Sequence, residues 1–118
     1  FQTKQSNFGL DLVAINIQRG RDHGIPSYNE LRRVCGLQQA SSFEHLQLFM
    51  PSTVAKKLKF LYKFVDDIDP FIGGISEYSV PGGIVGPTFR CIISEQFRRL
   101  KEGDRFYYEN EHEGGFSQ

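Results

Sequence analysis

The chain has 118 residues, 39% of them hydrophobic and 24% charged, and its formal net charge is zero. This length suits one small domain of ordinary globular composition, which argues against a disordered chain. The balanced charge argues against a nucleic-acid binder, and no apolar run approaches the length of a membrane span.

Helices are the predicted elements throughout. The first is expected over Leu10–Arg21, with Gly24 as its stop. A second, shorter helix is expected after Ser27, which is a good N-cap. Glu30 occupies the capping-box position, and Gly36 ends the helix.

The middle of the chain continues the helical pattern. "SSFEHL" repeats the capping signature, with Ser41 and Glu44 three residues apart. A further helix is expected after Pro51, and three lysines are expected opposite its apolar face. That face comprises Val54, Leu58, Leu61, Tyr62 and Val65, and the lysines are Lys56, Lys59 and Lys63.

The pattern breaks over residues 66–86, where we expect a partly ordered loop. The last helix is expected from Pro87, in the favoured first-turn position, to Gly103. Its predicted buried stripe is Phe89, Ile92, Ile93, Gln96, Phe97 and Leu100. The tail from Tyr107 is expected to be a frayed end, and the weak β signal predicts an all-α fold.

Four side chains of the first helix carry the most informative pattern. At helical spacing Leu12, Ile15, Asn16 and Arg19 share one face. Leu10, Val13, Ala14 and Ile17 share a neighbouring face, so the helix is predicted to be buried on two sides. A buried Asn16 needs a partner. That partner is either backbone or a group that the amide orients, such as a ligand or an imidazole. Arg19 needs an anion, either a ligand carboxylate or a residue such as Asp22.

Other candidate sites give weaker signals. His23 is either a general base or, as we favour, a cap of the helix end. "GGIVG" lacks the Lys-Ser/Thr pair of a phosphate loop, and "DDIDP" lacks the glycine and distal glutamate of a calcium loop, so a solvated turn is preferred for it. Cys35 and Cys91 are either two free thiols or one disulfide.

Three segments resemble the animal haem peroxidase family, the group that includes peroxidasin and myeloperoxidase. They are "FGLDLVAINIQRGRDHGIPSYNELRRVCGL", "DIDPFIGGISE" and "VGPTFRCIISEQFRRLKEGDRFYYEN", and they cover nearly the whole chain in the family's order. "NIQRGRDHGIPSYN" is highly specific. The resemblance implies that residues 1–118 are the C-terminal part of a mostly α-helical catalytic domain. A chain that begins at Phe1 without Met fits a piece of a longer protein.

By resemblance, Asn16 accepts the ring N–H of the proximal histidine that ligates the haem iron, and Arg19 lies near a haem propionate. Leu12 and Ile15 would line the proximal side of the porphyrin. Cys35 and Cys91 match positions that form a disulfide in the family, which favours a secreted protein.

The resemblance also implies what lies upstream of this chain. The distal histidine and arginine, the proximal histidine and the calcium site all precede the matched segments, so no catalytic residue or metal ligand is expected here. The implied function is haem-dependent reduction of hydrogen peroxide with oxidation of a halide, a phenol such as tyrosine, or another donor, in oxidative stress or extracellular cross-linking. The alternatives are a peroxidase-like interaction or matrix domain that has lost haem, and an incomplete fragment without independent activity.

Overall fold

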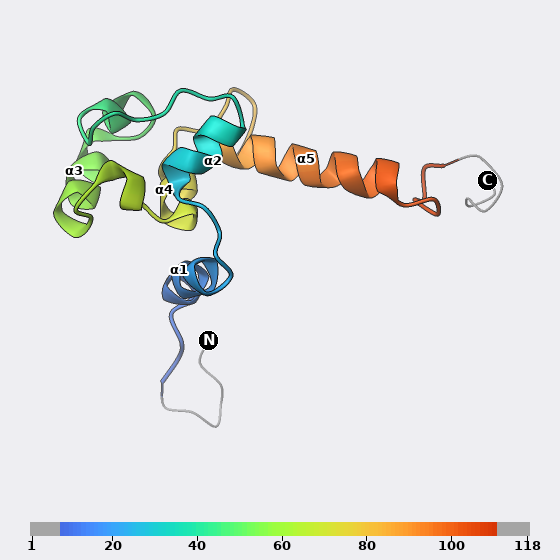
Figure 1. Ribbon diagram of the computed structural model, residues 1–118, viewed down its shortest axis with the longest axis horizontal. Coiled ribbons are helices and arrows are strands. Elements are labelled where there is room, and N and C mark those ends of the chain that lie inside the picture. The colour runs from blue at the N-terminus through green and yellow to red at the C-terminus, as the bar shows by residue number, and fades with distance from the viewer. Residues whose placement is uncertain (1–7, 111–118) are drawn as a thin grey trace.

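The computed structural model describes residues 8–110, which form a series of helices, most of them short, with one small core (Figure 1). In order these are α1 (Leu12–Asp22), α2 (Tyr28–Val34), the 3-10 turn η1 (His45–Leu48), α3 (Ser52–Leu61), the 3-10 turn η2 (Val65–Asp67), α4 (Pro70–Ser76) and α5 (Pro87–Gly103). No strand occurs in that range, so the predicted all-α class is confirmed. Within the same range no helix has the length and apolar character to cross a membrane.

Local capping determines where the first helices begin. The Asp11 carboxylate accepts a hydrogen bond from the Val13 backbone N–H at 2.9 Å, so α1 starts at Leu12 rather than at Leu10. Ser27 caps α2 as predicted, because its hydroxyl oxygen accepts from the Glu30 backbone N–H.

The core lies where α2, η1, α3 and η2 meet. Its fully buried large side chains include Tyr28, Leu46, Met50 and Ile68, with Leu58 of α3 beside them. The predicted apolar face of α3 is correct for Leu58 and Val65 but wrong for Leu61, which is 71% exposed. The helix ends at Leu61 and Tyr62 is extended, so Val65 is buried as part of η2 and not by a continuation of the α3 register.

The loop predicted over residues 66–86 is wrong in its first half, which contains most of η2 and all of α4. Pro70 opens α4 at the first-turn position. Gly73 lies against the Tyr28 ring and Gly74 against the Phe89 ring, so closely that a Cβ atom at either would overlap the aromatic carbons. The two glycines therefore let α4 pack tightly between α2 and α5.

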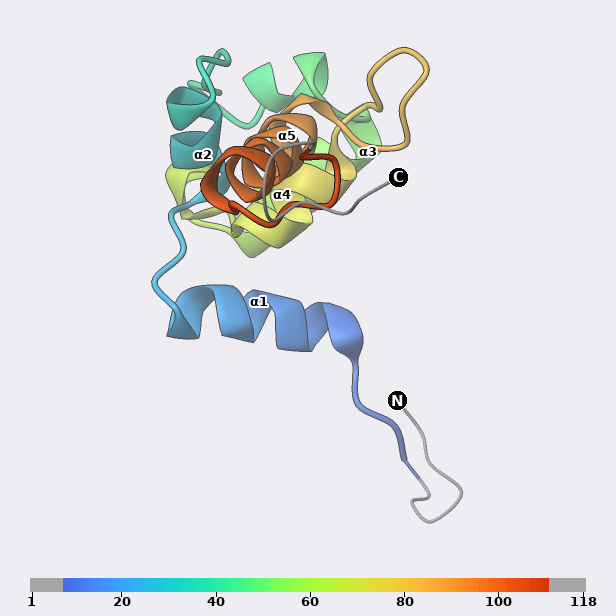
Figure 2. The ribbon, with the colours of Figure 1, turned by 90° about the vertical axis from the view of Figure 1, so that its right-hand side faces the viewer.

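The first predicted helix and the last project away from the core. Figure 2 shows α1 as a separate layer beside the other helices, and Figure 1 shows α5 extending to one side. The radius of gyration is 18.3 Å, against about 13–14 Å for a compact chain of this length.

Two burial predictions fail for this reason. Two-sided burial of α1 is wrong, since Leu12 is 50% exposed, and the stripe of α5 is largely exposed, with Phe97 at 60%. Within residues 8–110 no element covers these surfaces. Of the tail predicted to fray, residues 107–110 form turns, and residues 111–118 lie outside the described range, as do residues 1–7.

Candidate functional site

A cavity of about 520 Å³ lies between α1, α4 and α5. Its wall is mainly apolar and comprises Ile25, Leu31, Pro70, Phe71, Phe89 and Ile92. Its polar lining comes from α1 and the residue after it, through Asn16, Arg19 and His23. Two residues of the helix face predicted to carry a site, Asn16 and Arg19, therefore line this cavity.

An ion pair anchors α1 beside this cavity. Arg21 Nε donates to Asp69 Oδ1 at 2.9 Å, and Arg21 Nη2 donates to Asp69 Oδ2 at 2.6 Å. The Tyr62 hydroxyl donates to the same Oδ2 at 2.6 Å. The hydrogen bonds from Arg21 hold the pKa of the Asp69 carboxyl below its usual range, and those to Asp69 raise the pKa of Arg21.

Asn16 and Arg19 stand one turn apart on the cavity wall. Among residues 8–110, neither the Asn16 amide nor the Arg19 guanidinium has a hydrogen bond or ion pair to another side chain or to backbone. Both internal alternatives from the sequence therefore fail in this part of the chain. Asn16 is not bonded to backbone through its amide, and Arg19 is not paired with Asp22, whose carboxylate lies 4.0 Å from His23 Nδ1.

The other two residues of the predicted face lie elsewhere. Ile15 lines a second groove with Leu10, Ala14 and Arg19, and Arg19 also lines the main cavity. Leu12 is half exposed and borders neither space. The structure thus brings Asn16 and Arg19 together and leaves Leu12 and Ile15 beside them.

His23 acts as the predicted helix cap. Its backbone N–H donates to the Arg19 carbonyl oxygen at 3.0 Å, and its ring Nδ1 lies 2.9 Å from the same oxygen. Residues 8–110 contain no group of three His, Cys, Asp or Glu side chains that could hold a metal ion.

The solvated turn predicted for "DDIDP" is wrong for Asp69, whereas Asp66 and Asp67 are exposed. Asp69 is buried and paired as described above, and Asp66 Oδ1 accepts from Asn29 Nδ2 at 2.6 Å. Asp67 Oδ2 accepts from the Phe64 backbone N–H at 3.1 Å. Protein donors bind all three side chains, so the segment is a structural connection.

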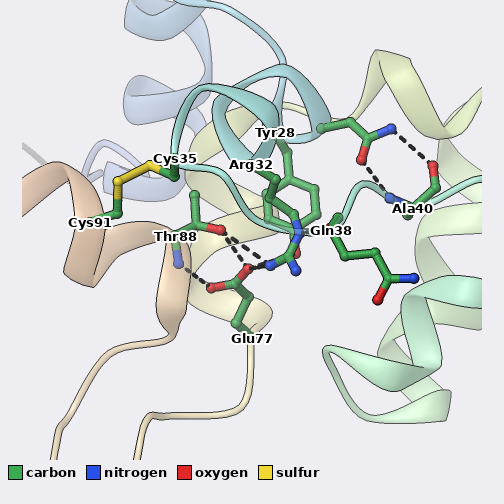
Figure 3. A network of polar contacts seen from close by, with 9 residues as sticks. Tyr28, Arg32, Cys35, Gln38, Ala40, Glu77, Thr88 and Cys91 are labelled. Carbon is green, nitrogen blue, oxygen red and sulfur yellow. Dashed lines mark hydrogen bonds and ion pairs between the residues drawn. A yellow bond between two sulfur atoms is a disulfide. The ribbon is translucent and has the colours of Figure 1, made fainter.

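The sequence did not predict a buried polar network that joins α2 to the start of α5 through Glu77 (Figure 3). At its centre the Glu77 carboxylate, with a fully buried side chain, forms an ion pair with Arg32 and accepts from the Tyr28 hydroxyl at 2.8 Å. It also accepts from the Thr88 backbone N–H at 2.9 Å and the Thr88 hydroxyl at 2.6 Å. Burial, and then the Glu77 charge, raise the pKa of the Tyr28 hydroxyl. The only sequence signal for this network was the helical spacing of Tyr28 and Arg32. That spacing does not show that Arg32 is buried and its neighbour Arg33 is exposed.

One disulfide joins the end of α2 to the first turns of α5. Cys35 and Cys91 are bonded, with 6.1 Å between their Cα atoms, so the disulfide alternative is confirmed. The bond and the Glu77 network together hold α5 against α2, and so place Phe89 and Ile92 in the cavity wall.

The model of the animal haem peroxidase family matches residues 1–118. The chain belongs to this family. This chain is 53% identical to peroxidasin of Drosophila melanogaster over 111 residues, and 46% identical to thyroid peroxidase of Rattus norvegicus over 109 residues. These alignments cover 93% and 91% of this chain. Among solved structures, Peroxidase A from Dictyostelium discoideum matches 89% of this chain, with a TM-score of 0.77 and 47% sequence identity.

The chain spans only a small part of these relatives. It covers 7% of the Drosophila peroxidasin, 12% of the rat thyroid peroxidase and 20% of the Dictyostelium structure. The family of this chain is therefore shown, but the activity of the whole relatives does not follow from so short a match.

Proposed function

We propose that this chain is the C-terminal portion of a haem peroxidase domain, and that its α1 contributes the proximal side of the haem pocket. The supporting observation is the cavity of about 520 Å³ with a mainly apolar wall, on which the Asn16 amide and the Arg19 guanidinium have no protein partner among residues 8–110. Haem presents an apolar macrocycle with carboxylate edges, so the donor set and the wall fit it.

Each residue has a definite part in this proposal. The Asn16 carbonyl oxygen accepts the N–H of a proximal imidazole supplied from outside this chain, which orients that ring. Arg19 binds a propionate through charge-assisted hydrogen bonds. Leu12, which is 50% exposed, and Ile15, which is partly buried, form the neighbouring apolar surface of the proximal wall.

When bound, haem supplies the redox chemistry by which hydrogen peroxide is reduced and a halide, a phenol such as tyrosine or another donor is oxidised. We propose that the distal histidine and arginine, the iron ligand and the family's calcium site lie in other parts of the domain. Oxidative-stress defence or extracellular cross-linking would be the biological setting. The Cys35–Cys91 disulfide supports a secreted protein, because such bonds persist in oxidising compartments.

A chimaera tests this proposal. Residues 8–110 would replace the matching segment of the Dictyostelium Peroxidase A, to which the chain is 47% identical. The chimaera should show a haem Soret band and peroxidase turnover. Asn16→Ala should lower turnover about 10- to 100-fold and shift the reduction potential of the iron. Arg19→Leu should weaken haem retention.

Gln18→Ala is the matched control, because it removes an exposed amide from the same helix outside the cavity. If Asn16→Ala leaves both turnover and potential at the level of Gln18→Ala, the assigned role is wrong. A chimaera that folds and takes up no haem would favour the haem-free interaction domain instead.

A further inference from the structure

Helix α3 has a second apolar surface that the core does not use. Its inner side is buried, with Ala55 1% and Leu58 2% exposed. On its outer side Phe60 is 91% exposed and Leu61 is 71% exposed, and Phe64 just beyond the helix is 58% exposed. Because the inner side already packs on the core, these outer side chains are surplus to its packing.

Lysines surround these apolar side chains. Residues 52–64 contain Lys56, Lys57, Lys59 and Lys63 and no acidic residue. Lys56 and Lys57 line a shallow hollow of about 360 Å³ with Phe60 and Leu61. We call Lys56, Lys57, Phe60, Leu61, Lys63 and Phe64 the α3 outer patch.

Most of this positive charge is not neutralised locally. Lys59 pairs with Glu44 at 2.6 Å. The nearest acidic neighbours in sequence, Asp66 and Asp67, lie beyond Phe64 and keep their charge, because their hydrogen-bond donors are neutral, but within the described residues neither forms an ion pair with these lysines. Within the described residues Lys56 and Lys57 form no ion pair, and Lys63 Nζ lies 5.2 Å from the Phe64 ring centroid. The outer patch therefore presents an excess of cations around exposed rings.

The exposed apolar side chains of α5 have a different setting. There Arg98 and Arg99 are paired with Glu95, Arg98 also with Glu102, and Lys101 with Glu109, so each cation in the C-terminal half of that helix is ion-paired. Figure 1 also places α3 at the opposite end of the molecule from the C-terminal end of α5. The combination of protruding apolar side chains and unbalanced cations belongs to α3.

We propose that the α3 outer patch binds the surface of an anionic lipid bilayer. Phe60, Leu61 and Phe64 enter the boundary between headgroups and acyl chains, and the lysine ammonium groups stay among the anionic headgroups. A sulfated polysaccharide would attract the lysines but would leave the protruding Phe60 ring in water. An acidic protein would need a pocket shaped for that ring, whereas a bilayer deforms around it.

The absence of tryptophan from the chain provides a direct probe. Phe60→Trp in the full 118-residue chain introduces a single indole into the patch. Vesicles of phosphatidylcholine with phosphatidylserine should shift its emission to the blue, and brominated acyl chains should quench it. Vesicles of phosphatidylcholine alone should do neither, and added salt should weaken the response.

Ile84→Trp is the matched control, since Ile84 is 95% exposed on a loop without flanking lysines. Its indole should show little quenching. In co-sedimentation with the same anionic vesicles, Phe60→Ser and the double variant Lys56→Ser/Lys57→Ser should each lower binding about tenfold, and Ile84→Ser should not. Helical circular dichroism and the intact disulfide confirm that each variant is folded.

Three results would overturn the proposal. The first is no binding to anionic vesicles, and the second is equal quenching at the two tryptophan positions, which would indicate general adhesion of exposed apolar surface. The third is undiminished vesicle binding by Phe60→Ser together with its retention on heparin, which would identify the patch as a polyanion site.

Discussion

Arg32→Met is the sharpest test of how the buried network holds this chain together. The substitution retains the apolar stem and removes the cation whose side chain is only 4% exposed. It leaves the Glu77 carboxylate buried, with hydrogen bonds from Tyr28 and Thr88 but without its counter-charge. It also removes the guanidinium that lies 3.8 Å from the Phe49 ring centroid.

The expected loss follows from that geometry. Breaking a buried ion pair by removing one partner costs about 3–5 kcal/mol, because the remaining charge is no longer compensated. The whole stability of a small domain is about 5–15 kcal/mol, so the change should be easy to detect. Urea unfolding followed by far-ultraviolet circular dichroism, with the disulfide intact, gives the free energy of unfolding.

Two variants decide whether the explanation is right. Arg33→Met removes the neighbouring arginine, whose pair with Glu30 is exposed, so it should be close to neutral. The double variant Arg32→Met/Glu77→Gln removes both buried charges and should recover part of the loss. If Arg32→Met unfolds at the same urea concentration as Arg33→Met, the network does not carry the stability assigned to it.

Three further predictions concern packing, pH and covalent structure. Gly73→Ala should destabilise the chain by about 1–3 kcal/mol in the same urea assay, because its Cβ would overlap an aromatic ring of α2. Ion pairing lowers the pKa of Asp69 in the folded state, so its stabilising contribution is complete above the ordinary aspartate value of 3.8 and is lost as the pH falls through the lowered value. Asp69→Asn should therefore flatten the acid side of a stability–pH curve. Reducing the Cys35–Cys91 bond, with a sequence separation of 56, should cost about 4 kcal/mol by the loop-entropy model, measured as the difference between urea curves with and without reductant.

Matched controls exist for the first two of these. Gly103→Ala places its Cβ in open space at the end of α5 and should not destabilise the chain. Asp22→Asn removes a carboxylate whose side chain is 67% exposed and should leave the pH curve unchanged. A loss with Gly103→Ala as large as with Gly73→Ala, or equal flattening by the two aspartate variants, would contradict the structural reasons given.

Helix boundaries were predictable where they depend on neighbouring residues. The Ser27 cap and the start of α5 at Pro87 involve contacts within one turn, so the sequence alone locates them. Helix α4 was missed because two adjacent glycines lower helix propensity. Here close packing of Gly73 on Tyr28 outweighs that cost, and the contact lies far along the chain.

Burial was less predictable than helicity. Helical spacing places four apolar residues of α5 on one side of the helix, namely Ile92, Ile93, Phe97 and Leu100. Such spacing shows only that this side is apolar. Whether another element covers it depends on the rest of the fold, and in residues 8–110 nothing does. The α3 outer patch is the opposite case, since Phe60 and Leu61 protrude from a helix whose other side is fully packed.

The position of the candidate haem site depends on a pair that no local pattern could identify. Arg19 and Arg21 are two residues apart, and Asp66, Asp67 and Asp69 offer three carboxylates. The structure pairs Arg21 with Asp69, and Arg19, which has no side-chain partner among the residues that the structure describes, lines the cavity instead. Had Arg19 taken the carboxylate, α1 would be rotated by about half a turn, since residues two apart are about 200° apart on a helix. Asn16 would then face away from the cavity. The Arg21–Asp69 pair therefore determines which side of α1 faces the cavity, although neither residue lines it.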